Sequence, residues 1–123
     1  MIPEKMYQVL NTEGVVAIAT DGEGGLHLVN TWNSYVKAED GNKLVIPVGG
    51  MNKTQRNIEL NPRVLLTLGS REVQGKRGPG AGFLVVGVGT FAVNGRYFES
   101  VKERFPWARA ALIVDIRSVE QTL

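Results

Sequence analysis

The residues best suited to chemistry form one short run, Val45 to Thr54, in which an apolar strand pattern gives way to two glycines and a polar turn. Adjacent glycines let the backbone approach a ligand without side-chain hindrance, and the amides that begin a helix point towards negative charge. Lys53, three residues after the second glycine, adds a full positive charge. The spacing predicts a seat for an anion such as phosphate. The same letters also suit an ordinary strand-to-helix turn with a solvated lysine.

A second run lies upstream and contains two aromatic rings among four small hydrogen-bonding side chains. Such a mixture can hold a flat heteroaromatic group by stacking on its face and by bonding to its polar edge. On residue type alone, the rings would equally suit core or interface packing. Together with the anion seat, the run predicts a phosphorylated planar cofactor. Its residues are Asn30, Thr31, Trp32, Asn33, Ser34 and Tyr35.

Composition removes several classes of chemistry. The chain has 123 residues, the size of one domain spanning residues 1–123, and no cysteine, so it has no disulfide, thiolate nucleophile or Cys-ligated metal. His27 is the only histidine, which excludes a multi-histidine metal site. No Ser/His/Asp set or pair of carboxylates can be singled out for hydrolysis. We therefore predict no metal site and assign no catalytic side chain.

The charge balance is close to neutral, with 14 basic and 12 acidic residues and a net charge of +2. This small excess gives little support for nucleic-acid binding. No apolar run approaches membrane-spanning length, and the first residues lack the pattern of a secretory signal. A soluble, cytoplasmic protein without a membrane or nucleic-acid partner is the expectation.

The positioning elements follow from periodicity and turn residues. Six strands, two or three short helices and mostly short turns predict a mainly β, antiparallel barrel. Pro47 cannot donate a ladder hydrogen bond, so its strand should lie at an edge or end there. The expected strands are 14–20, 26–36, 43–48, 63–70, 83–94 and 109–117, the helices are 3–10, 54–60 and 97–104, and residues 71–82 are expected to form a loop.

One tempting motif is excluded by its context. The run Gly87-Val88-Gly89-Thr90-Phe91-Ala92 has glycines spaced as in a dinucleotide fingerprint, but it lies inside a predicted strand and opens no helix. We interpret Gly87 and Gly89 as marks of a bend or of close packing. A Rossmann-type NAD site is therefore not predicted.

Several blocks of the chain resemble one known family. The blocks cover nearly the whole chain at one spacing: 14–20, 30–35, 47–54, 107–112 and 120–123. They are similar to the split-barrel flavoproteins related to pyridoxamine 5′-phosphate oxidase, and among these to the small FMN-binding proteins of sulfate-reducing bacteria.

This resemblance implies a six-stranded antiparallel split barrel that forms a homodimer, with FMN bound non-covalently near the interface. Lys53 and Thr54 match residues that hold the phosphate, and Leu123 matches a tail residue that reaches the flavin of the partner subunit. Strand residues assist the phosphate, the turn faces the polar edge of the flavin, and the rings pack about it. The expected cofactor-binding residues are Asn30, Thr31, Trp32, Asn33, Ser34, Tyr35, Pro47, Val48, Gly49, Gly50, Met51, Lys53, Thr54, Trp107 and Leu123.

The function that this implies is a small FMN electron carrier or oxidoreductase with an unidentified redox partner protein. The larger oxidases of the family carry extra basic residues for a pyridoxal-type substrate, and we find no convincing match to them here. A pyridoxamine-phosphate-oxidase-like enzyme stays a second alternative. A third is a small barrel that binds single-stranded nucleic acid on aromatic faces. Against it, the rings are flanked by Asn, Thr and Ser instead of cations.

Overall fold

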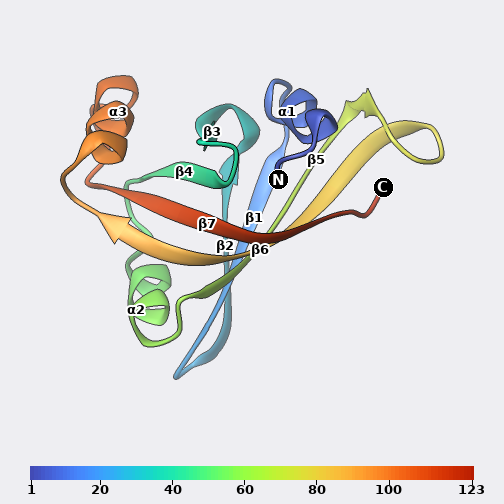
Figure 1. Ribbon diagram of the computed structural model, residues 1–123. Coiled ribbons are helices and arrows are strands. Elements are labelled where there is room, and N and C mark those ends of the chain that lie inside the picture. The colour runs from blue at the N-terminus through green and yellow to red at the C-terminus, as the bar shows by residue number, and fades with distance from the viewer.

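The computed structural model describes residues 1–123 and is built around one strongly curved sheet (Figure 1). All seven strands pair antiparallel, in the order β2-β1-β5-β6-β7-β4-β3. This confirms the predicted mainly β, antiparallel architecture. The strands are β1 (Val15–Gly22), β2 (Gly25–Trp32), β3 (Lys37–Glu39), β4 (Lys43–Val48), β5 (Arg63–Gln74), β6 (Pro79–Ala92) and β7 (Ala110–Gln121).

The helices are short and lie at the rim of the sheet: α1 (Glu4–Leu10), α2 (Asn52–Leu60) and α3 (Arg96–Arg104), with a 3-10 turn η1 (Asn33–Tyr35) after β2. Helix α1 packs on β5, α2 on the β1–β2 hairpin, and α3 on β7 and β4. No helix is both long and apolar enough to cross a membrane.

The core follows from period-two alternation in the strands. On β1 the inward side chains are Val16, Ile18 and Thr20, all buried, and β5 continues the layer with Val64 and Leu66, both fully buried. Twenty-one buried residues form the main hydrophobic cluster, and a smaller one lies beneath α3. The rigid sheet therefore fixes the positions of the loops at its two ends.

Three sequence expectations need correction. The strand count is seven, because the predicted strand 26–36 ends at Trp32 and, after η1, a separate short β3 pairs with β4. Residues 71–82 are not a free loop, since β5 and β6 extend into a long hairpin with a register shift between Ser70 and Gln74. Strand β7 continues to Gln121, well beyond the predicted end at Arg117. In each case cross-strand pairing extended or divided what local residue preference suggested.

Two special positions are confirmed. A side chain at Gly87 would place its Cβ 2.6 Å from Val114 Cγ1, so the strand can approach β7 only without one, and the β6–β7 register shifts beside it. Pro47 pairs with Ala111 of β7, but β3 covers β4 only as far as Val45. At Pro47 no strand lies beside β4 on the side facing away from β7, so the missing N–H leaves no acceptor without a partner.

Candidate functional site

The turn from β4 to α2 is held from one side by a single cation. Arg109 Nε lies 3.1 Å from both the Gly49 and Gly50 carbonyl oxygens, and its Nη2 lies 2.7 Å from Gly50 O. The backbone amide of Arg109 also donates to Val48 O at 2.8 Å. Both ends of one arginine therefore fix the path of the glycine pair.

The amides of this turn, unlike its carbonyls, make no hydrogen bonds within the chain. None of the six consecutive N–H groups from Gly49 to Thr54 donates a hydrogen bond within the chain. Met51, just before α2, adopts the left-handed conformation at φ 58°, ψ 34°, and no side chain caps the helix. The turn presents a run of free donors, which is an anion-binding arrangement.

Thr54 lies in the first turn of α2 and is fully buried. Its hydroxyl oxygen Oγ1 has no hydrogen-bond partner in the chain. A buried, unpartnered hydroxyl is costly, so such a group in a native fold calls for a partner that the chain does not supply. The exposed Lys53 precedes it, with Nζ extending over the β1–β2 turn, 3.5 Å from where a Cβ on Gly24 would lie.

Three aromatic rings cluster beside the glycine turn. The ring centroids of Tyr35, Phe105 and Trp107 lie 4.8, 5.4 and 6.1 Å apart in pairs, all tilted. Trp107 packs so closely on the turn that a Cβ added at Gly49 would lie 3.2 Å from its Cζ3 atom. Trp107 is nevertheless 53% exposed. The structure thus brings two predicted ring residues together with the predicted turn.

The remaining residues of the 30–35 run divide between the two faces of the sheet. Thr31 is buried, whereas Asn30 and Trp32 are exposed. Trp32 makes no ring contact with the aromatic cluster. Asn33 is fully buried, and its Nδ2 donates to the carbonyls of Val9 and Gly69, which gives it a structural role. Its Oδ1 has no partner in the chain.

Leu123 lies at the opposite end of the molecule from the turn (Figure 1). Val48 pairs with Ala110 at the start of β7, whereas the tail follows the end of that strand at Gln121. Between these two ends the chain runs eleven residue steps of strand at about 3.3 Å each, a path of roughly 36 Å along β7. Within one chain, Leu123 cannot join the other predicted site residues.

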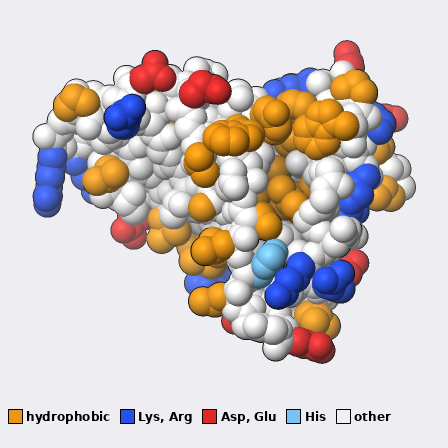
Figure 2. All heavy atoms as spheres, turned by 180° about the vertical axis from the view of Figure 1, so that it is seen from behind, with side chains coloured by type: hydrophobic (Ala, Val, Ile, Leu, Met, Phe, Trp, Pro, Cys, Tyr) orange, Lys and Arg blue, Asp and Glu red, His pale blue; other side chains and the backbone are white.

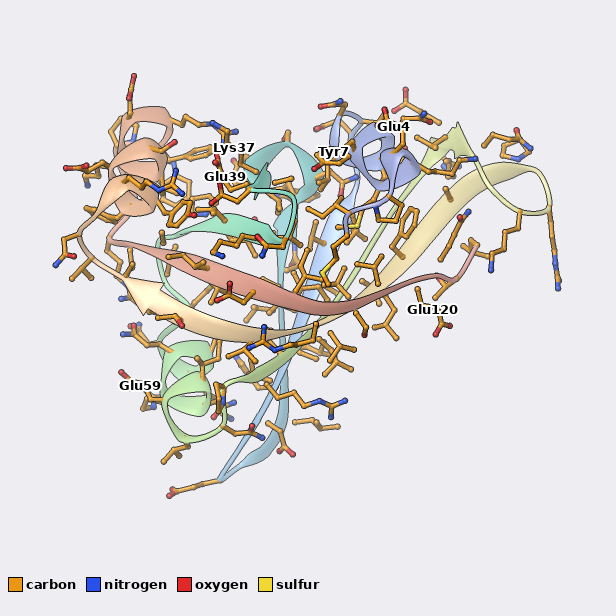
Figure 3. All side chains as sticks on the ribbon, in the orientation of Figure 1. Glu4, Tyr7, Lys37, Glu39, Glu59 and Glu120 are labelled. Carbon is orange, nitrogen blue, oxygen red and sulfur yellow. The ribbon has the colours of Figure 1, made fainter.

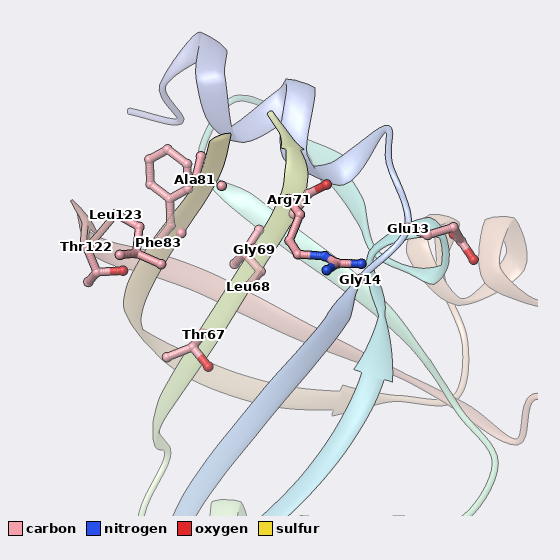
Figure 4. A pocket seen from close by; sticks show the side chains of 13 residues that line it. Glu13, Gly14, Thr67, Leu68, Gly69, Arg71, Ala81, Phe83, Thr122 and Leu123 are labelled. Atoms are coloured by element: carbon pink, nitrogen blue, oxygen red, sulfur yellow. The ribbon is translucent and has the colours of Figure 1, made fainter. Parts of the chain in front are cut away.

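The tail borders its own hollow of about 440 Å³ (Figure 4). The backbone of Thr122 and Leu123 is bonded to Gly82 of β6, which fastens the tail along the hollow. Arg71 projects across it towards Gly14 and the neighbouring Glu13. The Leu123 side chain is 62% exposed. This second region is mostly apolar and glycine-lined, unlike the donor-rich turn.

Sequence reasoning missed two residues of the turn region, Arg109 and Phe105. A lone arginine at the entry of an apolar strand, two residues after a tryptophan, was the available signal for Arg109. Its partners are backbone carbonyls of a segment 59 and 60 residues away, which spacing along the chain does not reveal.

The residues with a shifted pKa lie outside the turn region. The hydroxyl of Tyr97 on α3 donates to Asp40, and this bond lowers the pKa of the Asp40 carboxyl. The hydrogen bond to Asp115, 3.0 Å away, raises the pKa of Lys43. Lys37 and Glu39 on β3 form a further ion pair, 3.3 Å apart (Figure 3). Asp115 of β7 thus pairs with Lys43 of the neighbouring strand β4.

Comparison with known proteins gives consistent matches along the whole length. Residues 2–122 match the family described as pyridoxamine 5′-phosphate oxidase. The FMN-binding protein of Nitratidesulfovibrio vulgaris (strain Miyazaki F) is 58% identical over 123 residues, with both chains fully covered.

Solved structures share the fold at low sequence identity. HupZ of Group A Streptococcus superimposes with a TM-score of 0.82 at 19% identity, covering 99% of this chain and 94% of that one. An FMN-binding protein from Syntrophomonas wolfei gives 0.74 at 14%, with coverages of 98% and 85%. At such identities these likenesses establish the architecture alone.

Proposed function

The chain belongs to the pyridoxamine 5′-phosphate oxidase family, and from that premise we propose that it is an FMN-binding flavoprotein that carries electrons, with each flavin held between two copies of the chain. The observation that carries the proposal is the run of six unbonded amides from Gly49 to Thr54. The 58% identical relative, named FMN-binding protein, supports FMN as the ligand.

The donors of the turn fit the phosphate of FMN. A phosphate offers several strong acceptors, and helix-start amides together with a lysine are a common way to bind it. The buried Thr54 hydroxyl, which lacks a partner, would gain one from the same group. In this proposal Lys53, Thr54 and the first amides of α2 bind the phosphate, with Asn30 and Thr31 assisting.

The glycine pair and the rings would serve the flavin ring. Gly49 and Gly50 leave the backbone bare, so their amides can bond the polar edge of a planar group, with Pro47, Val48 and Met51 beside it. Trp107 packs on Gly49 and Tyr35 packs on Trp107, and Trp32 and Ser34 would complete the surroundings, while the buried Asn33 supports the fold behind them. FMN, when bound, supplies the electron-transfer chemistry, so the chain needs to bind it, orient it and set its environment.

An exposed apolar region on the β1–β2 hairpin supports a homodimer. Leu26 and Leu28 on the edge strand β2 are 82% and 69% exposed, and Val15 opposite Trp32 is also exposed. Seen from behind, apolar side chains gather over this side of the molecule, near the single histidine (Figure 2). Such surfaces are typical of interfaces. A second copy could also bring its Leu123 to the flavin, which the same chain cannot do.

The proposed role is electron transfer instead of acid–base catalysis on an organic substrate. The ionisable groups whose pKa is shifted, Asp40, Lys43 and Tyr97, lie around α3 and β4 and form surface pairs with one another or with Asp115. They are placed to fasten elements together and not to move a proton at the turn. The redox partner would be another protein.

The test compares two ligands that differ by one group. Apoprotein is titrated with FMN and with riboflavin, and bound ligand is followed by flavin fluorescence. We expect FMN to bind at least tenfold more tightly, since each charge-assisted contact contributes about 1.5–3 kcal/mol. Equal affinities would contradict the phosphate seat, and no binding of either ligand would overturn the proposed function.

A further inference from the structure

Arg109 has no carboxylate partner. The three ion pairs of the chain involve Lys37, Lys43 and Arg96. The guanidinium of Arg109 instead makes three contacts of 2.7–3.1 Å, all to the carbonyls of Gly49 and Gly50. Because Arg109 bonds two successive carbonyls and no carboxylate, it forms no ion pair. Its effect is therefore to orient the two peptide groups.

That effect follows from peptide geometry. In a trans peptide the carbonyl of one residue and the amide of the next point in opposite directions, and the chain has no cis peptide. Because Arg109 draws the Gly49 and Gly50 carbonyls to its own side, the amides of Gly50 and Met51 must point away from it. These are two of the donors that have no partner within the chain.

The turn also contains a residue in an unfavourable backbone conformation. Met51 is a non-glycine residue at φ 58°, a conformation that costs of order 1 kcal/mol or more and persists only where its surroundings enforce it. Met51 follows directly on the two peptide groups that Arg109 holds. The residue two positions before Arg109, Trp107, closes on Gly49. One short segment therefore fixes the turn.

We propose that Arg109 is a positioning residue that keeps the Gly49–Gly50 turn in its donor-outward form and thereby sets the preference of the protein for reduced over oxidised FMN. The proposal rests on the proposed function, since it needs FMN at this turn. Reduction increases the electron density at the polar edge of the flavin, and both oriented N–H donors and a fixed cation stabilise added negative charge.

The first experiment measures the dissociation constants of oxidised and of chemically reduced FMN for wild type, Arg109→Gln and Arg109→Lys. Arg104→Gln is the matched control. It removes one positive charge beside the aromatic cluster, where Arg104 lies over the Phe105 ring, but leaves the glycine turn intact.

We expect Arg109→Gln to reduce the preference for reduced FMN about tenfold, which lowers the two-electron potential by about 30 mV. Arg104→Gln should change it less than twofold. Lysine keeps the charge but cannot reproduce the fork of donors, so Arg109→Lys should fall between wild type and Arg109→Gln. Full rescue by lysine, or an equal effect of Arg104→Gln, would reduce the role to charge and overturn the positioning claim.

A second experiment needs no flavin. The backbone amide NMR signals of Gly50 and Met51 are recorded in the ligand-free proteins, with and without inorganic phosphate. Both signals should move in Arg109→Gln and stay in place in Arg104→Gln. Unchanged amides in a folded Arg109→Gln protein would refute the proposal even if FMN binds. If Arg109→Gln does not fold, the same amide signals are compared between wild type and Arg109→Lys. A wild-type protein that does not bind FMN would contradict the proposed function instead.

Discussion

The two ends of β7 carry surfaces of opposite character. At its start, the turn between β4 and α2 presents unbonded amides, an arginine that fixes carbonyls, and three clustered rings. At its far end, the tail borders a hollow lined largely by glycine and apolar residues. One end can bind and orient an anionic planar ligand, and the other can cover an apolar ring. The fold keeps them apart in one chain, and the site that we propose therefore combines the turn of one copy with the tail of another.

The largest effect should come from breaking the turn end. Replacing Lys53 by Gln removes the charge beside the helix-start amides and should weaken FMN binding about 10- to 100-fold, the equivalent of one charge-assisted contact. Riboflavin binding should be unchanged, because riboflavin has no phosphate. Lys37→Gln, which removes an exposed lysine on β3, is the control, and fluorescence titration gives the constants.

Thr54→Val sharpens the same test, since it keeps the shape of the side chain and removes only the buried hydroxyl. It should also weaken FMN and spare riboflavin. A Thr54→Val protein that binds both flavins as wild type does, yet is more stable, would show that this hydroxyl has no ligand partner.

The next effect should come from the tail end. Leu123→Ala removes most of an exposed apolar side chain that we expect to contact the partner's flavin, and should weaken FMN about tenfold, in line with a buried leucine. Its stability should hardly change, because Leu123 is 62% exposed within the chain. Light scattering on the holoprotein should give the mass of a dimer.

Mixed dimers separate a two-chain site from a one-chain site. Dimers of one Lys53→Gln chain and one Leu123→Ala chain should contain one site with both changes and one with neither. Stoichiometric titration should then find half of the sites at wild-type affinity. If instead every site in the mixture is weakened, the tail and the turn of each site come from the same chain, which the path of roughly 36 Å along β7 between them would not permit without rearrangement.

A smaller effect concerns the rings of the turn end. An excited flavin is a strong oxidant, so an indole or phenol against it should quench its emission. We expect longer emission lifetimes for FMN bound to Trp32→Phe, Tyr35→Phe or Trp107→Phe than for wild type, at a stability cost of roughly 1–3 kcal/mol or less. Unchanged lifetimes in all three would make these residues packing groups only.

The smallest effect concerns the attachment of α3, which carries the aromatic cluster at its end. Asp40 accepts a hydrogen bond from Tyr97 and pairs with Arg96 at 2.8 Å, and its pKa is lowered. A carboxyl with a lowered folded-state pKa contributes stability above its unfolded pKa and loses it as the pH falls through the folded value. Asp40→Asn should therefore destabilise slightly at pH 7, and the difference from wild type should shrink as the pH falls below the usual carboxyl range, as thermal unfolding would show.

Contact of the tail with flavin should not respond to Asp40→Asn, because the β3–β4 turn lies beside Asp115 and Ile116, in the middle of β7 and before its end at Gln121. A loss of stability that persists unchanged in acid would mean that the substitution acts through something other than the ionised carboxylate.

Much of the fold was predictable because strand alternation is local. Residue patterns located six of the seven strands, and Pro47 and Gly87 marked their special positions correctly. Strand β3 and the long β5–β6 hairpin were not predictable, because a three-residue segment and a glycine-rich, charged segment become strands only when a neighbouring strand supplies the hydrogen bonds.

The amino-acid sequence by itself determined the kinds of chemistry available: a bare glycine turn with a lysine, nearby rings, and neither cysteines nor a second histidine. These are properties of residue type and of short spacing. The tertiary structure alone decided that Arg109 reaches the turn and that Leu123 lies away from it. It also decided that the amides of the turn make no hydrogen bond within the chain. Those facts depend on which strands pair, because β7 brings residue 109 against residues 48–50 and carries residue 123 to the opposite end.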